Sequence, residues 1–226
     1  MRIESEILGY ALQYRVYTPP GYDDLSELPV IYVTDGQWYI DSGEMPALMD
    51  QLIADGKIEP AVAVFIDNRN PDNLNENRRN RQFFCNQRYA DFYTKELIPH
   101  IDATYKTSKN RSSRVILGLS FGGLNSACFG LQAYKDIEGI AMQSPAMHPV
   151  PNLFNQYKNV GKLPINIFLS SGTHRDNEAR TRAFRDVLTD IGYDFHYVEV
   201  PFDHSWENWK PLLDDVLIYY FGSSTN

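Results

Sequence analysis

A strand-like run that ends in a serine between glycines constrains this chain more than any other feature. Residues 114–119 read RVILGL, the next four read SFGG, and a helix-like stretch covers 122–132. A chain that turns abruptly from strand to helix strains the turn residue, and the residues two before and two after it must be small. The GxSxG pattern of Gly118, Ser120 and Gly122 therefore predicts a turn that exposes one serine hydroxyl. A phosphate-binding turn is the alternative, but the lysine of a Walker motif does not follow.

Strand-like and helix-like stretches alternate along the chain. Residues 3–22 read as an antiparallel pair, and the further strand-like runs are 28–36, 60–67, 114–119, 137–145, 163–172 and 195–201. The helix-like stretches are 44–56, 89–105, 122–132, 177–192 and 206–221. This alternation predicts an α/β fold with a mostly parallel central sheet and helices on both faces. We expect a long polar loop at 68–82 and a small lid-like connection at about 144–163.

Composition narrows the class of protein. Apolar residues make up 43% of the 226 residues, which suits a single domain over 1–226. A net charge of -8 argues against nucleic acid and anionic membrane surfaces as partners. The sequence has no metal-binding spacing, no run long enough to span a membrane and no visible signal peptide. We therefore expect a cytoplasmic protein with no metal or other cofactor, and we interpret Cys128 as a buried thiol. The sequence does not decide the oligomeric state, and a homo-oligomer is one option.

A serine needs a base, and the base needs an orienting acid, to become a strong nucleophile. In folds with this turn the order along the chain is serine, acid, histidine. His204 follows the last predicted strand, so it is the expected base. The acid is expected in the loop after 163–172, where Asp176 comes first and Glu178 second. Asp176 could instead cap the following helix, and Asp203 is a weaker candidate because sequence neighbours point apart.

Backbone N–H groups are expected to stabilise an oxyanion. Phe121 follows the serine at the start of a helix, and Gln37 follows Asp35-Gly36 in the loop after the strand at 28–34. Aromatic residues near these loops, Trp38 and Trp206, are candidates for a substrate wall, whereas Trp209 is assigned to the core.

One cationic cluster stands out in this acidic chain. It contains Arg78, Arg79, Arg81 and Arg88. Arg78 and Arg79 are candidates for binding an anionic substrate by bidentate contacts. The alternative is a solvated loop whose arginines pair with surface carboxylates.

Five segments together resemble the Putative esterase family of α/β-hydrolases. They are YVTDGQ, FIDNRN, YADFYTKELIPHIDATY, GLSFGG and DHSWENW. The resemblance covers about residue 10 to 220 and is strongest to the branch of the enterochelin (ferric siderophore) esterases. It implies an α/β-hydrolase fold with Ser120 as nucleophile, His204 as base, an acid at the Asp176 loop, and backbone donors at Gln37 and Phe121. Two departures are visible: Phe121 stands where methionine is common, and Asp203 where glycine often precedes the histidine. Enterochelin esterases have an N-terminal domain in front of the hydrolase domain, and we do not expect that domain here.

The sequence thus predicts a serine esterase for a small-molecule carboxylic ester, such as a siderophore lactone or another small acyl or aryl ester. An acyltransferase or an S-formylglutathione-type thioesterase would use the same acyl-enzyme, because only the second step differs. A non-catalytic binding protein on the same scaffold is the alternative from another class.

Overall fold

Eight strands form one twisted sheet in the computed structural model, which describes residues 1–223. The strands are β1 (Arg2–Ser5), β2 (Tyr10–Tyr17), β3 (Val30–Thr34), β4 (Val62–Asp67), β7 (Arg114–Leu119), β8 (Gly139–Gln143), β9 (Asn166–Gly172) and β10 (Phe195–Val200). Their order is β1-β2-β4-β3-β7-β8-β9-β10. The pairs β1–β2 and β2–β4 are antiparallel and the others are parallel. The predicted α/β fold with a mostly parallel sheet is confirmed.

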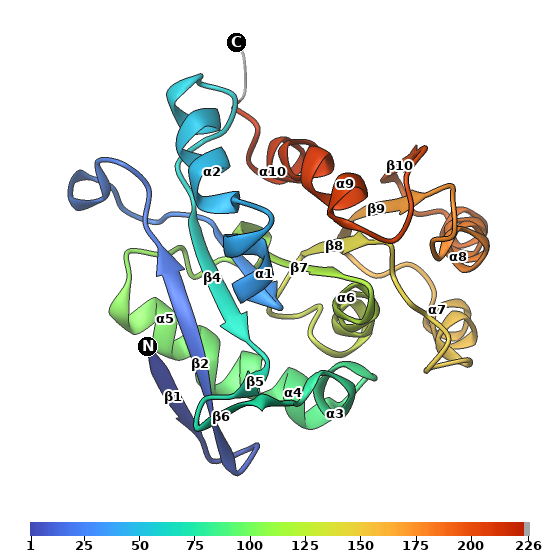
Figure 1. The fold of residues 1–226 in the computed structure, drawn as a ribbon, viewed down its shortest axis with the longest axis horizontal. Helices are drawn as coiled ribbons and strands as arrows, with labels where there is room; N and C mark the ends of the chain where they lie inside the picture. The colour runs from blue at the N-terminus through green and yellow to red at the C-terminus, as the bar shows by residue number, and fades with distance from the viewer. Residues whose placement is uncertain (224–226) are drawn as a thin grey trace.

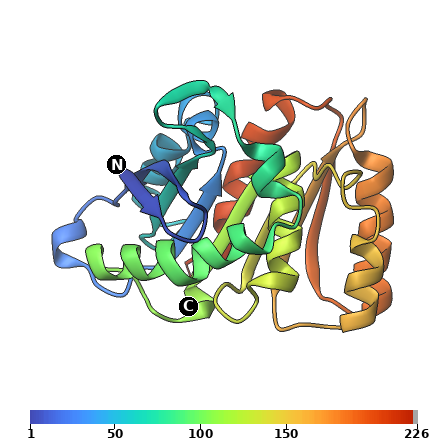
Figure 2. The same cartoon turned by 90° about the horizontal axis from the view of Figure 1, so that it is seen from below.

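Helices cover both faces of the sheet (Figure 1). One layer contains α1 (Gly36–Asp41), α2 (Met45–Ala54), α9 (Trp206–Trp209) and α10 (Leu213–Phe221). The other contains α3 (Arg79–Phe83), α4 (Gln87–Phe92), α5 (Ile98–Thr104), α6 (Phe121–Gln132), α7 (Leu153–Val160) and α8 (Glu178–Ile191). Figure 2 looks onto this second layer, with the green helix α5 in front of the strands. Among residues 1–223, no helix has the length and apolar character needed to cross a membrane.

Strand residues alternate between these two layers. In β3, Val30 and Tyr32 pack with the second layer, whereas Ile31 and Val33 pack with the first. Successive side chains of a strand point to opposite faces, so a strand covered on both sides is apolar throughout. This explains why the central strands appear in the sequence as continuous apolar runs.

The predicted loop at 68–82 is wrong in part. It contains a hairpin of β5 (Arg69–Asn70) and β6 (Asn73–Asn77), and α3 begins at Arg79. Polar side chains hold the hairpin: Asn70 donates to Glu76 at 2.8 Å and accepts from the Asp72 N–H at 3.0 Å. Such side-chain bonds need no apolar alternation, so a pattern search does not find them.

The helix predicted at 89–105 is a composite. Its ends are α4 and α5, and a π-helical turn at Tyr93–Leu97 joins them. Pro99, in the first turn of α5, has no N–H to offer a regular helical ladder. π turns occur where such a ladder is interrupted.

Cys85 and Cys128 form a disulfide, so the interpretation of Cys128 as a thiol is wrong. The Cα atoms are 5.0 Å apart and the bond joins the segment after α3 to the middle of α6. A count of two cysteines excludes a disulfide framework but not a single bond, which depends on proximity in the fold. Disulfides are typical of oxidising compartments. The bond argues against the expected cytoplasmic location, which stays a prediction.

The connection at 144–163 contains α7, which packs on the core. Leu153 and Tyr157 are fully buried, and the Tyr157 hydroxyl donates to the Ala127 carbonyl in α6 at 2.7 Å. A lid role for the remainder of this connection stays a prediction, as does the single catalytic domain over 1–226.

Candidate active site

Ser120 lies on a sharp turn between β7 and α6. Its φ and ψ are 55° and −118°, a conformation that a residue other than glycine rarely adopts. Its N–H donates to the Gln143 carbonyl at 2.9 Å, and its own carbonyl accepts from the N–H groups of Leu124 at 3.1 Å and Ala146 at 2.9 Å. These bonds fix the strained backbone.

The two glycines beside Ser120 are required by close packing. A Cβ on Gly118 would lie 2.3 Å from the backbone of Gly122, and a Cβ on Gly122 would lie 2.7 Å from Thr34 Oγ1. Real Cβ atoms do not approach so closely, so larger residues would displace the turn. The steric condition inferred from GxSxG is met in the fold.

His204 connects the serine to a carboxylate. Its Nε2 is 2.9 Å from Ser120 Oγ, and its Nδ1 is hydrogen-bonded to Asp176 Oδ1. Ser120, Asp176 and His204 follow β7, β9 and β10, whose carboxyl ends meet at one edge of the sheet. The His204 side chain is 34% exposed, whereas that of Asp176 is fully buried. The histidine therefore faces both solvent and a shielded acid.

Asp176 is surrounded by donors. Its Oδ2 accepts from the Gly172 N–H at 2.5 Å, from Ser144 Oγ at 2.6 Å, and from Asn208 Nδ2 at 3.1 Å. Burial works to raise the pKa of Asp176, but hydrogen bonds from His204, Ser144 and the Gly172 backbone outweigh it and lower that pKa. The carboxylate is thus held ionised.

The alternatives for the acid lie elsewhere. Glu178 accepts the Asp176 N–H at 3.0 Å and does not contact His204. The residue that precedes α8 is Asn177, so Asp176 is not its cap. Asp203 offers its carbonyl to Asn208 Nδ2 at 3.0 Å.

Ser144 links Asp176 to the side chains of Asn208 and Trp209. It is fully buried with φ at 45°, and it donates to Asp176 while accepting from Trp209 Nε1 at 2.9 Å and Asn208 Nδ2 at 3.1 Å. Trp209, which is 6% exposed, is confirmed as a core residue. The indole and the amide thereby anchor the hydroxyl that contacts the acid.

The expected oxyanion donors both stand in the first turn of a helix. Gln37 is the second residue of α1 and Phe121 is the first of α6. N–H groups there have no partner within the helix. The loop that leads to Gln37 is fixed by Asn68, whose Oδ1 accepts the Asp35 N–H at 2.9 Å.

A buried ion pair lies beside these donors. The Nε of Arg79 is 2.8 Å from Oδ1 and 3.0 Å from Oδ2 of Asp35, whose side chain is 0% exposed. Burial raises the pKa of Asp35 to about 6, although the guanidinium opposes this rise. The same guanidinium lies 4.9 Å from the centre of the Trp38 ring. Arg79, predicted to bind substrate or to pair on the surface, is 15% exposed and pairs with an interior carboxylate.

Two hollows meet at Ser120 and His204. The first, which we call the tryptophan hollow, has a volume of about 420 Å³ and is lined by Trp38, Ser42, Arg79, Leu119, Trp206 and Trp209. The second, the arginine hollow, has a volume of about 300 Å³ and is lined by Phe121, Ala146, His148, Arg175, Asp176 and Asn177. A hollow of about 440 Å³ between α2 and the start of α10 contains none of the residues that surround Ser120.

Arg78 lies outside both hollows. Its Nε donates to Glu76 at 2.8 Å, its Nη1 donates to the Ala11 carbonyl at 3.2 Å, and its guanidinium lies 4.4 Å from the centre of the Tyr10 ring. The contact with the exposed Glu76 supports the alternative in which this arginine pairs with a surface carboxylate.

Sequence reasoning gave no role to Asp35, Asn68, Ser144 or Asn208. The first three have a common signal, because each is the polar residue directly after a buried strand. Asn208 has no such signal, since its role depends on the packing of α9 against the loop that contains Asp176.

Known proteins place the chain in a family. The Esterase family model, described as "Putative esterase", matches residues 5–220. A xylanase/feruloyl esterase of Xylanibacter ruminicola is 30% identical over 57% of this chain and 19% of its own length. An iron(III) enterobactin esterase of Yersinia enterocolitica is 27% identical over 54% of this chain and 33% of its own length. The chain thus spans far less than two thirds of either relative.

Solved structures share the fold. An enterobactin esterase of Shigella flexneri, crystallised in the presence of enterobactin, superposes with a TM-score of 0.87 at 21% identity, over 96% of this chain and 57% of that one. A ferulic acid esterase superposes with a TM-score of 0.80 at 18% identity, over 98% and 96% of the two chains. The strand order, the turn at Ser120 and the match over residues 5–220 together show that the chain is a member of the Putative esterase family, with an α/β-hydrolase fold.

Proposed function

We propose that this protein is a serine hydrolase that cleaves carboxylic esters through an acyl-enzyme on Ser120. One observation carries the proposal: His204 Nε2 lies 2.9 Å from Ser120 Oγ while its Nδ1 is held by Asp176. A nucleophile within hydrogen-bond reach of a base, and a base held by a third group, is the geometry of activated serine.

The reaction would proceed in two halves. Ser120 Oγ attacks the carbonyl carbon and its proton passes to His204 Nε2. The bond from carbon to the alcohol oxygen then breaks, and His204 returns the proton to the departing alcohol. Water then attacks the carbonyl carbon of the acyl-enzyme and gives one proton to His204 Nε2. The bond from that carbon to Ser120 Oγ breaks, His204 returns the proton to Oγ, and the acid leaves.

Charge develops on the carbonyl oxygen in each half. The N–H groups of Gln37 and Phe121 are proposed as donors to that oxyanion, and losing one such donor typically lowers the rate by about 10²–10³. Asp176 stays ionised because hydrogen bonds lower its pKa. Its negative charge can therefore stabilise the protonated form of His204.

The substrate class follows from the tryptophan hollow. Trp38 and Trp206 offer flat apolar surfaces to a small acyl or aryl group. The relatives named for enterobactin and feruloyl esters support siderophore lactones and aromatic-acid esters as candidates.

The test is hydrolysis of 4-nitrophenyl esters from acetate to decanoate, with Ser120→Ala as control and fluorophosphonate labelling in parallel. Turnover should fall by at least about 10⁴ in the variant, and the label should map to Ser120. Full turnover by Ser120→Ala, or a label on another residue, would refute the proposal. Labelling of Ser120 without hydrolysis would replace it with the acyltransferase or thioesterase alternative.

A further inference from the structure

The two hollows at Ser120 differ in the charge that they offer. The charged side chain of the tryptophan hollow, Arg79, is already paired with the buried carboxylate of Asp35. The arginine hollow contains Arg175, and its carboxylate, Asp176, is 0% exposed and occupied by His204 and by its own donors. A cation without an accessible counter-charge is therefore found on one side of the serine only.

Arg175 is free to bind a ligand. It lies exposed on the turn between β9 and α8, and it forms no ion pair with a carboxylate in the described range 1–223. The nearest carboxylates along the chain are turned to other partners, since Asp176 faces His204 and Glu178 accepts the Asp176 N–H. Its φ of 50° is in the left-handed region, which is costly for a residue with a side chain. The turn nevertheless places a long cationic side chain beside Ser120.

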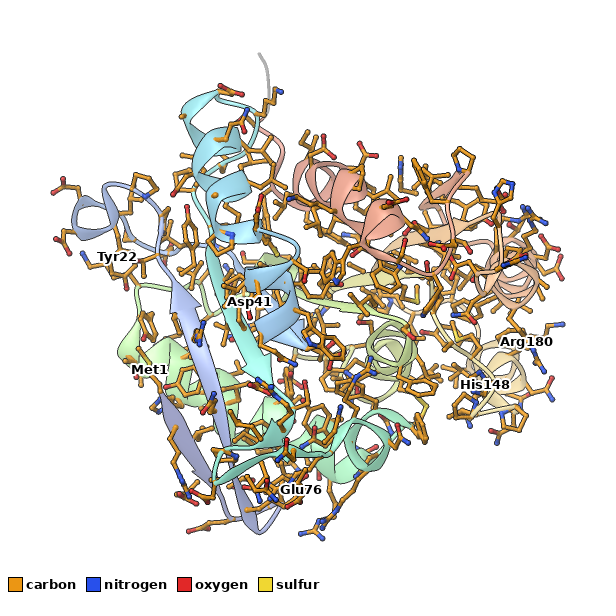
Figure 3. All side chains as sticks on the ribbon, in the orientation of Figure 1. Met1, Tyr22, Asp41, Glu76, His148 and Arg180 are labelled. Carbon is orange, nitrogen blue, oxygen red and sulfur yellow. A yellow bond between two sulfur atoms is a disulfide. The ribbon has the colours of Figure 1, made fainter. Side chains whose placement is uncertain are left out.

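The charge of the whole chain makes this placement more selective. The net charge is -8, so the chain as a whole repels anions. Neither hollow is lined by an exposed carboxylate. His148 belongs to the connection after β8 (Figure 3). It forms another part of the arginine hollow, and its ring lies 5.6 Å from that of Phe121. A cleft lined by one sign of charge raises the local concentration of the opposite charge.

We propose that Arg175 binds a carboxylate carried by one half of the ester, while the other half lies in the tryptophan hollow. The inference rests on the proposed function, because it names the substrate class of the same site. A guanidinium suits this ligand, since its planar fork donates two parallel hydrogen bonds to a carboxylate. The ester bond lies at Ser120, where the two hollows meet.

Matched ester pairs test the inference. With the charge on the alcohol half, 3-acetoxybenzoate is compared with 3-acetoxybenzamide. With the charge on the acyl half, the 4-nitrophenyl monoester of glutaric acid is compared with that of glutaramic acid. We expect kcat/KM to favour the carboxylate by about tenfold in one of the pairs, as charge-assisted hydrogen bonds allow. Added salt should reduce the ratio.

Two charge-matched variants assign the effect. Arg175→Gln should bring the preferred ratio close to one. Arg180→Gln removes the same charge from an exposed position on α8 (Figure 3). Arg180 lines neither hollow, so this variant should keep the wild-type ratio. Ratios near one in both pairs of the wild-type protein, or a preference that survives Arg175→Gln, would overturn the inference and leave the esterase proposal intact. Absence of hydrolysis of all four esters together with no labelling of Ser120 would remove both.

Discussion

Two buried aspartates at the same edge of the sheet have opposite electrostatic behaviour. Asp176 and Asp35 each have a side-chain exposure of 0%. The pKa of Asp176 is lowered, whereas burial raises that of Asp35 to about 6. Their surroundings differ: Asp176 accepts from a histidine, from serine and amide side chains and from a backbone N–H, whereas Asp35 faces one guanidinium.

Two features account for this difference. Asp35 is a buried residue throughout while Asp176, taken as a whole residue, is only half-buried, so desolvation acts more strongly on Asp35, and Asp176 has several directed donors where Asp35 has a single counter-charge. A buried carboxylate has about four lone-pair positions to satisfy, and each donor that reaches one favours the ionised form. In the proposed mechanism Asp176 must stay ionised while His204 gains and loses a proton. In the same mechanism Asp35 takes no part in proton transfer, and we expect it to hold Arg79 near Trp38.

The largest expected effect is a difference in kcat between variants of the two aspartates. Asp176→Asn should lower kcat by about 10⁴, because the amide cannot support the protonated histidine. Asp35→Asn should lower it by only about 10- to 100-fold, through small displacements of the loop that contains Gln37. The comparison uses 4-nitrophenyl ester kinetics with circular dichroism as a folding control. Equal losses in the two variants would contradict the division of roles.

The next effect separates them by the pH dependence of stability. Since the folded pKa of Asp35 lies above its unfolded value, this residue lowers the free energy of unfolding as the pH rises from about 4 to about 6. The rise from 3.8 to about 6 corresponds to about 3 kcal/mol. Urea unfolding at pH 4 and pH 7 tests this. The free energy of unfolding of Asp35→Asn relative to that of the wild type should be higher at pH 7 than at pH 4 by about that amount.

Asp176 gives the opposite sign. Its folded pKa is lowered, so its stabilising contribution is present above the unfolded value and is lost as the pH falls through the folded one. Asp176→Asn should thus lose stability relative to the wild type as the pH rises from strongly acidic values.

The prediction for Asp35 has its own contrary outcome. If the difference in free energy of unfolding between Asp35→Asn and the wild type does not change with pH, Asp35 is not desolvated.

The smallest expected effect tests the donors of Asp176. Ser144→Ala removes one donor and leaves Trp209 Nε1 without its acceptor, which should cost about 1–3 kcal/mol of stability. Because the acid loses a fixed contact, kcat should fall while KM stays near its wild-type value. Ser170→Ala is the matched control: it is a buried serine on β9 whose Oγ has no hydrogen-bond partner within the described residues. Similar losses in the two variants would show that Ser144 acts through packing alone.

The sequence predicted the parts of this site that depend on local rules. The turn at Ser120 follows from sterics between residues two apart, and the order of serine, acid and histidine follows from the succession of strands. The acid was narrowed to one loop, but the choice between Asp176 and Glu178 needed the path of that loop in space. Local pattern cannot supply a path that is set by the Gly172 N–H, Ser144 and Asn208 from three separate segments.

Long-range pairs account for what was missed. Asp35 and Arg79 are 44 positions apart, and the sequence predicts for Arg79 only an anionic substrate or surface carboxylates, with no particular partner. The disulfide spans 43 positions and joins the segment after α3 to α6, and the proximity of these two segments is a property of the fold. The hairpin at 69–77 is held by side chains, so it has no apolar signature.

Because of the disulfide, the redox conditions under which the protein is prepared decide which covalent form is studied. Cys85 follows α3, which begins at Arg79, and Cys128 lies in α6, which begins directly after Ser120. The bond therefore joins the segment that follows Arg79 and its contact with Trp38 to the helix that follows Ser120. Protein made in a reducing cell and protein made in an oxidising one would share every residue and differ by a pair of hydrogen atoms. Rates from the two sources should be compared only after the state of these cysteines has been determined by mass.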